Sequence, residues 1–232
     1  MQADQAIKNR KTQKVLADTP LDSTKTPEQL EATINALLEL AAHAPYHKRC
    51  DEKYTKAGQK LNSCVPWRFY VLDTKNCRAL VSHITEHGLK TGKIANMLAA
   101  ADVLFLVTWL PDPPEIDDTI DNTQRSNTQE PIPFEGTIKN MEHIAAASAA
   151  IQNVLIGATA RDIPNYWSSG GQLRNLELRN YLEIPMSEIL LGAIFLFPPG
   201  LDDTSVTIKT GAMRNQGKDK TTWSTSIELV TK

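Results

Sequence analysis

The stretch that decides the fold is residues 140–171, which read NMEHIAAASAAIQNVLIGATARDIPNYWSSGG. Between Ile144 and Ala160 nearly every residue is small or apolar, and Gln152 and Asn153 are the only larger polar side chains. A helix with one face in water carries a charged stripe at 3.6-residue spacing, and this segment has none. We therefore expect a buried helix that other elements enclose on most of its circumference.

A glycine loop follows this helix. The helix must stop before Pro164, because the residue that precedes a proline is pushed out of the α region. The chain then reads Tyr166-Trp167-Ser168-Ser169-Gly170-Gly171, directly before a new helical pattern from Gln172 to Leu182. Glycine permits dihedral angles that other residues avoid, so the backbone N–H groups of this loop can face a ligand. A ring system could lie there, with Trp167 beside it.

Composition excludes several classes of function. The 232 residues suffice for one large domain, and a net charge of −2 gives no case for a nucleic-acid or anionic-membrane partner. The three cysteines lack CxxC spacing and the five histidines form no HExxH motif, so neither a disulfide framework nor a metal site is indicated. The N-terminal residues contain no hydrophobic signal region. The longest strongly apolar run, Ile189 to Phe197, is far shorter than the ~20 residues that span a bilayer, so we expect a cytoplasmic location.

Local signals predict the other elements of a single domain, residues 1–232. Thr26-Pro27-Glu28-Gln29 is typical of a helix start, with a capping box and proline at the first helical position, and this helix should end near Ala44-Pro45. Polar composition predicts a loop from Tyr46 through Lys60. Residues at about 111–136 are rich in proline and acidic residues, which predicts a lid-like surface loop. The remaining predictions are strands at 68–72, 103–109, 189–197 and 222–230, and helices from about Asn76 to Leu89 and onward to Ala100.

The last of these strands is predicted from alternation. Trp223, Thr225, Ile227 and Leu229 alternate with polar residues, which describes a strand with one buried face. Residues 201–220 before it are too polar to cover that face. We therefore expect the tail to pair with the sheet of a second subunit.

A local cationic site lies near the N-terminus. Lys8, Arg10, Lys11 and Lys14 have no acid between Asp4 and Asp18. The cluster is either a solvated basic face or a phosphate site on which Arg10, Lys11 and the Thr12 hydroxyl converge.

No side-chain constellation for catalysis stands out. The sequence lacks Ser-His-Asp order, a paired-carboxylate motif, GxGxxG after a strand and GxxxxGK[ST]. His47 and His143 are isolated in the sequence. Any chemistry therefore belongs to a bound cofactor, which the protein positions.

Several separated segments together resemble the flavin-dependent nitroreductase family. Asn9-Arg10-Lys11-Thr12 resembles the family's Arg-Arg-Ser segment, and Ala44-Pro45-Tyr46-His47-Lys48 with Pro66-Trp67 resembles its Ala-Pro and Gln-Pro-Trp elements. The Asn153 helix and the glycine loop are similar to the segments that hold the isoalloxazine and offer an N–H to its N5. Arg214, nine positions before Trp223, resembles the late phosphate-binding arginine. The resemblance implies that flavin mononucleotide (FMN) contacts Arg10, Lys11, Thr12, Lys14, Tyr46, His47, Lys48, Pro66, Trp67, Asn153, Trp167, Ser168, Ser169, Gly170, Gly171 and Arg214.

Two departures from the family pattern limit this transfer. Arg49 to Val65 form an insertion between the His-Lys and Pro-Trp elements, and Val65 stands where the family has glutamine, so the ligand contact of that glutamine does not carry over. Lys11 replaces the second arginine and would bind phosphate as a point charge, without a bidentate fork.

The resemblance implies an α+β fold, with a central mixed sheet wrapped by helices, in a homodimer that binds FMN at the subunit interface. The implied activity is ping-pong reduction of a nitroaromatic, a quinone or a similar electron acceptor by NAD(P)H. The flavin N5 would carry the hydride, so no catalytic side chain and no metal is expected. One alternative is a reductase or dehalogenase dedicated to a single metabolite, with 49–65 and 111–136 as a selective lid. Another is a flavin-binding sensor or storage protein without turnover.

Overall fold

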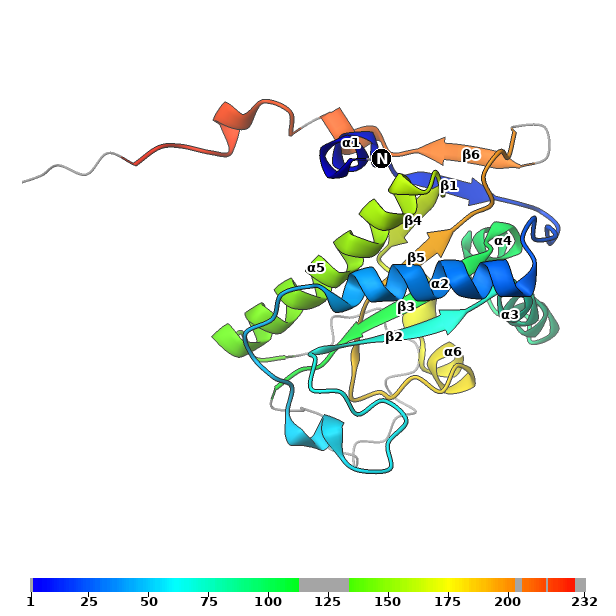
Figure 1. Cartoon of the computed structure of the whole chain (residues 1–232). Helices are drawn as coiled ribbons and strands as arrows, with labels where there is room; N and C mark the ends of the chain where they lie inside the picture. The colour runs from blue at the N-terminus through cyan, green and yellow to red at the C-terminus, as the bar shows by residue number, and fades with distance from the viewer. Residues whose placement is uncertain (1, 113–133, 203–205, 216, 228–232) are drawn as a thin grey trace, which may run out of the picture.

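A computed structural model describes residues 2–112, 134–202, 206–215 and 217–227 (Figure 1). The α-helices are α1 (Ala3–Asn9), α2 (Pro27–Ala42), α3 (Thr74–Glu86), α4 (Ile94–Ala100), α5 (Ile138–Ala160) and α6 (Leu176–Tyr181). The strands are β1 (Gln13–Leu16), β2 (Trp67–Leu72), β3 (Val103–Trp109), β4 (Asn165–Ser168), β5 (Ile189–Leu196) and β6 (Thr207–Thr210). Short 3₁₀ turns are η1 (Glu52–Thr55), η2 (Gly171–Arg174), η3 (Ala212–Asn215) and η4 (Lys220–Thr222).

The central sheet has four strands in the order β2-β3-β5-β4, and β1 and β6 form a separate two-stranded sheet. Strand β3 is buried along its whole length, as expected for a continuous apolar run in the middle of a sheet. The predicted α+β fold with a central sheet is confirmed. Every pairing between described strands is antiparallel, so a parallel member, which a mixed sheet requires, would come from outside the described residues.

Helices cover both faces of this sheet, because alternate residues of β3 point to opposite sides. Leu104 and Leu106 belong to an apolar cluster with residues of α3, α4 and α6. Phe105 and Val107 belong to a second cluster with residues of α2 and α5. The sheet thus separates two cores, one on each face.

Helix α5 starts at Ile138, six residues before the predicted apolar helix, where the Thr137 side chain accepts a hydrogen bond from the Asn140 N–H. It is long and apolar enough to cross a bilayer, but half of its most apolar window is buried in the protein, as in the core helix of a folded domain. Gly157 lets α2 cross α5 closely, because a Cβ at Gly157 would overlap Leu40 (Figure 1). On the outer side Met141 and Ala145 are exposed, so the described part of the chain encloses only part of the circumference.

The start of α2 matches its prediction. The Thr26 side chain accepts from the Gln29 N–H, the Gln29 side chain accepts from the Thr26 N–H, and Pro27 occupies the first turn. These contacts satisfy N–H groups that have no partner within the helix.

Three predictions about local structure were wrong. Tyr166 and Trp167 lie in β4 and not in a loop. The predicted helix 172–182 divides into η2 and α6, because Asn175 is extended at φ −66° and ψ 144°. Residues 222–227 of the predicted last strand are η4 and irregular chain, since the described part of the subunit offers them no strand partner; residues 228–230 lie outside the described residues. Most of the predicted lid at 111–136 also lies outside them.

Candidate functional site

The predicted site residues fall into two groups within one chain. Lys14 and the glycine loop lie around β1, β4 and the start of α4, whereas His47 and Lys48 lie on the insertion side, with η1 at the far end of the molecule from β1 (Figure 1). Asn153 lies on α5 and lines neither hollow. The two hollows that these groups line have no lining residue in common among the described residues.

The first group surrounds a hollow of about 320 Å³, here called the glycine-loop hollow. Its lining comes from β1, the turn before α4, α4 and the glycine loop: Lys14, Thr91, Gly92, Lys93, Ile94, Met97, Ser168, Ser169, Gly171 and Gln172. Ser168 lies on the same face of β4 as Tyr166, whose ring centre is 5.4 Å from Lys14 Nζ. One part of the hollow is therefore cationic, formed by Lys14 and Lys93, and another part is formed by the glycine loop.

The glycine loop needs its glycines for two reasons. Gly170 has φ 100° and Gly171 has φ 49°, which side chains with a Cβ rarely adopt. A Cβ at Gly170 would also lie 2.8 Å from Leu190 Cδ2, and one at Gly171 would lie 3.3 Å from Ile94 Cδ1. The loop is fixed by a hydrogen bond from the Gly170 N–H to Ser168 Oγ at 3.2 Å. Its backbone can thus approach a ligand closely.

Three lysines make this hollow electropositive. Lys14 pairs with Lys209 across β1 and β6, and Lys93 reaches the hollow from the turn before α4. Burial, then the charges of Lys93 and Lys209, lower the pKa of Lys14. None of the three forms an ion pair within the described part of the chain. An anion placed here would relieve their repulsion.

Arg10, Lys11 and Thr12 form the turn from α1 into β1. Arg10 is the C-cap of α1, and Lys11 lines a separate hollow of about 410 Å³ with Gln13 and Asn165. The Thr12 carbonyl accepts a hydrogen bond from the Gly211 N–H at 3.2 Å. That bond brings η3, which contains Arg214, beside the same turn. The N-terminal and late basic segments are therefore neighbours in the fold.

Trp167 faces away from the glycine-loop hollow. Its side chain packs with the α2–α5 cluster, on the opposite side of β4 from Tyr166. The indole fills the space above Gly192, where a Cβ would overlap Nε1. The aromatic side chain that adjoins Lys14 is that of Tyr166. The sequence predicts Trp167 beside a bound ring system, and that contact stays a prediction.

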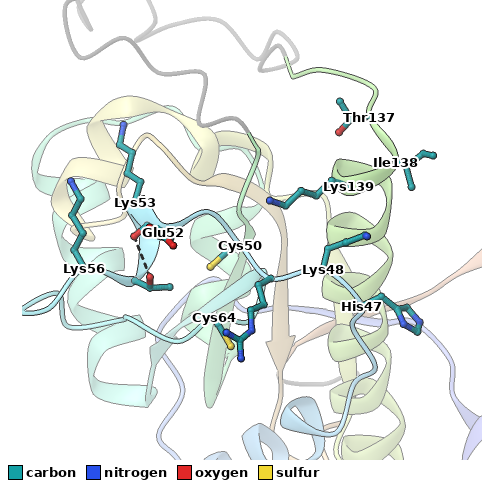
Figure 2. A pocket seen from close by; sticks show the side chains of 12 residues that line it. His47, Lys48, Cys50, Glu52, Lys53, Lys56, Cys64, Thr137, Ile138 and Lys139 are labelled. Atoms are coloured by element: carbon teal, nitrogen blue, oxygen red, sulfur yellow. Dashed lines mark hydrogen bonds between the residues drawn. The ribbon is translucent and has the colours of Figure 1, made fainter.

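The second group adjoins a larger open hollow of about 1370 Å³, here called the basic hollow (Figure 2). It is lined by the insertion and by the N-terminus of α5: His47, Lys48, Arg49, Cys50, Glu52, Lys53, Thr55, Lys56, Cys64, Thr137, Ile138 and Lys139. Tyr46 packs edge-on against Trp67 with ring centres 5.8 Å apart, and Pro66 leads into β2. Val65, which replaces the expected glutamine, packs against the α2–α5 cluster.

Arg68 holds the insertion to the sheet. Its guanidinium is 4% exposed and donates to four carbonyl oxygens. Nη1 donates to Val65 at 2.9 Å and Trp67 at 2.8 Å, and Nη2 donates to Tyr54 at 3.1 Å and Ser63 at 2.9 Å. The middle of the insertion, at Tyr54, and its C-terminal end, at Ser63 and Val65, are thereby tied to the first residues of β2.

Two other polar residues of α5 have structural contacts. Asn153 Nδ2 donates to the Leu40 carbonyl at 3.0 Å and so joins α5 to α2. His143 is fully buried, with Nδ1 2.8 Å from the Leu110 carbonyl. That contact fits the structural role most isolated histidines have.

Sequence reasoning missed Thr91, Lys93 and Tyr166. The first two lie in Thr91-Gly92-Lys93 directly before α4, and a glycine-containing turn ahead of a helix was an available signal. The sequence alone predicts a loop at Tyr166, and the contact of its ring with Lys14 depends on which face of β4 it occupies.

No protein-family model matches this chain, and no curated protein matches it. Solved structures do. A nitroreductase-like family protein from Bacillus cereus is 18% identical over 99% of this chain and 96% of its own, with a TM-score of 0.56. A putative nitroreductase from Desulfovibrio desulfuricans in complex with FMN is 19% identical over 87% and 88%, with a TM-score of 0.51. The nitroreductase CinD from Lactococcus lactis in complex with nicotinic acid is 12% identical over 87% and 91%, with a TM-score of 0.54. The chain therefore has the nitroreductase fold.

Proposed function

We propose that this chain, which has the nitroreductase fold, is an FMN-dependent oxidoreductase that uses NAD(P)H to reduce a small electron-accepting molecule. The observation that carries the proposal is the glycine-loop hollow, which Lys14 and Lys93 line together with the backbone of the glycine loop, with Lys209 beside Lys14 on β6. The solved neighbour from Desulfovibrio desulfuricans is described with FMN, and that ligand combines a phosphate with a flat ring.

The residues present fit such a ligand. Clustered lysines are suited to a phosphate, since burial and then the charges of Lys93 and Lys209 lower the pKa of Lys14, and Arg10 and the backbone of η3 lie along the adjoining turn. Gly171 lines the hollow, so the loop presents backbone without a side chain at that position. When bound, FMN would supply two-electron chemistry at N5. The protein would then bind and orient the FMN and exclude water from the site.

The proposal includes a homodimer. The glycine-loop hollow is at the lower end of the about 300–1,000 Å³ typical of small-molecule sites. It would hold part of FMN, and the Tyr46–Lys48 group lies elsewhere on the same chain. A two-fold arrangement would bring that group from a partner to this hollow, and would cover the outer face of α5 around Met141 and Ala145.

The C-terminal tail supports the same arrangement. Residues 217–227 extend away from the rest of the chain (Figure 1), and Trp223 and Ile227 are 66% and 83% exposed. Large apolar side chains on an extended tail are suited to packing on a second subunit. A single domain of residues 1–232 and a cytoplasmic location remain predictions that accompany this proposal.

A reductase or dehalogenase dedicated to one metabolite is the second candidate. It is favoured by the insertion, which Arg68 fixes to the sheet and which forms most of the basic hollow. In the proposed dimer, the fixed insertion of the partner subunit beside the site would select among acceptors more narrowly than an open surface.

The decisive experiment is a visible spectrum of the purified protein, followed by anaerobic titration with NADH and NADPH. We expect a yellow protein, or one that becomes yellow with added FMN, that is bleached by one of the nucleotides and recovers when an acceptor is added. A protein that binds FMN and stays oxidised would be a sensor or storage protein. A protein that does not bind FMN at all would refute the proposal.

A further inference from the structure

Two of the three cysteines close the base of the insertion. The Cys50 N–H donates to the Cys64 carbonyl at 3.1 Å, and Cys50 Sγ lies 3.6 Å from the carbonyl of Ser63. With standard bond lengths, the backbone bond keeps the two Cα atoms within about 7 Å of each other. A disulfide needs a Cα separation of up to about 6.8 Å. The two free thiols are therefore within reach of each other once their side chains turn inward.

Both cysteines line the basic hollow (Figure 2). Cys64 is half-buried and open to the hollow, whereas Cys50 is 7% exposed. Around them stand the cations Lys48, Arg49, Lys53, Lys56 and Lys139, and among the described residues of the lining Glu52 is the one acid. Lys139 pairs with Asp112, and no other of these cations has an ion pair within the described residues. The hollow thus attracts anions, although the whole chain carries a net charge of −2.

The two thiols differ in environment. Burial raises the pKa of the Cys50 thiol, and the Arg68 guanidinium partly offsets that effect. Cys64 lies against a phenol, with its Sγ 3.6 Å from the Tyr46 hydroxyl. Since the thiolate is the nucleophile in disulfide exchange, Cys64 is suited to react first and Cys50 second.

Cys77 provides an internal contrast. It is fully buried in the core, its Sγ donates to the Leu72 carbonyl at 3.7 Å, and burial raises its pKa to about 12. Such a thiol is inert.

We propose that Cys50 and Cys64 are a redox-active pair that is oxidised by anionic low-molecular-weight peptide disulfides. The Cys64 thiolate attacks one sulfur of the disulfide, forms a mixed disulfide and releases one thiol. The Cys50 thiolate then attacks Cys64 Sγ, releases the second thiol and leaves an intrachain disulfide. In total one disulfide is reduced to two thiols, and the two protein thiols lose two protons and two electrons. The step uses no flavin and is independent of the proposed function.

The bridge would fix the insertion at its base. It would close the loop from Cys50 to Cys64, which carries Lys53 and Lys56, and it would hold Cys64 beside Tyr46. A reversible disulfide of this kind in a reducing compartment serves as a sensor and not as a framework. Oxidation would therefore restrain one wall of the basic hollow.

The first test is intact-mass analysis of the full chain after incubation with oxidised glutathione. We expect wild type to lose the mass of two hydrogens and to retain one free thiol, mapped to Cys77. Cys50→Ser should stop at a glutathione adduct on Cys64, Cys64→Ser should form neither product, and Cys77→Ala should form the bridge like wild type. Stable adducts in wild type without a bridge, or a bridge that includes Cys77, would overturn the proposal.

The second test concerns the charge of the oxidant. At low salt we expect anionic oxidised glutathione to form the bridge at least tenfold faster than cationic cystamine. Lys53→Glu with Lys56→Glu should remove that preference, and added salt should reduce it. Lys75→Glu, an exposed lysine on α3, is the matched control and should change nothing. Equal rates for the two oxidants in wild type would refute the role of the basic hollow.

Discussion

Replacing Gly170 with alanine tests the geometry of the glycine loop. Gly170 has φ 100° and ψ −30°. A left-handed conformation costs a residue with a Cβ about 1–2 kcal/mol. The new Cβ would also lie 2.8 Å from Leu190 Cδ2, and overpacking of a filled site costs about 1–3 kcal/mol. We therefore expect Gly170→Ala to lower the free energy of unfolding by about 2–5 kcal/mol.

Gly58→Ala is the matched control. Gly58 has φ 89°, and a Cβ there would meet nothing within 4 Å, so it carries the dihedral cost alone. The two variants should differ by about 1–3 kcal/mol in urea unfolding, and this difference measures the contact with Leu190. FMN titration of the folded variants should show weaker binding for Gly170→Ala only. Equal unfolding free energies together with equal FMN affinities would refute the reasoning, because the loop would then tolerate a side chain.

The other predictions concern the first long helix, the basic segments and the tail. Thr26→Ala should lower the free energy of unfolding by about 1 kcal/mol, measured by urea denaturation, because it removes the capping box of α2. Arg10→Ala should cost on the order of 1.5–3 kcal/mol of FMN affinity and leave riboflavin affinity unchanged; unchanged affinity for both would refute a phosphate contact. A bound phosphate should raise the lowered pKa of Lys14, so FMN affinity should fall as pH rises through the pKa of free Lys14, and Lys14→Met should abolish that part of the pH profile. Truncation after Lys220 should weaken the dimer and lower flavin occupancy, and sedimentation with the flavin-to-protein absorbance ratio would show whether the dimer stays intact instead.

Elements with strong local signals were predictable from the sequence. The capping box before α2, the proline after α5 and the apolar runs of β3 and β5 each specify structure through neighbouring residues. The sheet pairing and the two short strands β1 and β6 were not predicted. Each of these two has four residues, β6 is mostly exposed, and they pair residues such as Lys14 and Lys209 that are far apart in the sequence.

The candidate site was predictable in part for the same reason. The glycine loop and the basic N-terminal segment can each be recognised from their own residues. The structure brings Lys14 of that segment to the loop. Which ring faces Lys14 depends on the face of β4 that Tyr166 and Trp167 occupy, and one residue of register reverses that choice. The Thr91-Gly92-Lys93 turn before α4 is a local signal, but the packing of α4 against β1, which brings Lys93 to the site, is not encoded locally.

The contacts of Arg68 make the insertion inseparable from the sheet in any redesign. Excising residues 49–65 would leave a guanidinium that is 4% exposed without the carbonyl oxygens of Tyr54, Ser63 and Val65. A buried charge that loses its partners is strongly destabilising. A loopless variant should therefore carry an uncharged residue at Arg68 as well. Conversely, grafting this insertion onto a shorter protein of the same fold would require an arginine at the second position of the receiving strand.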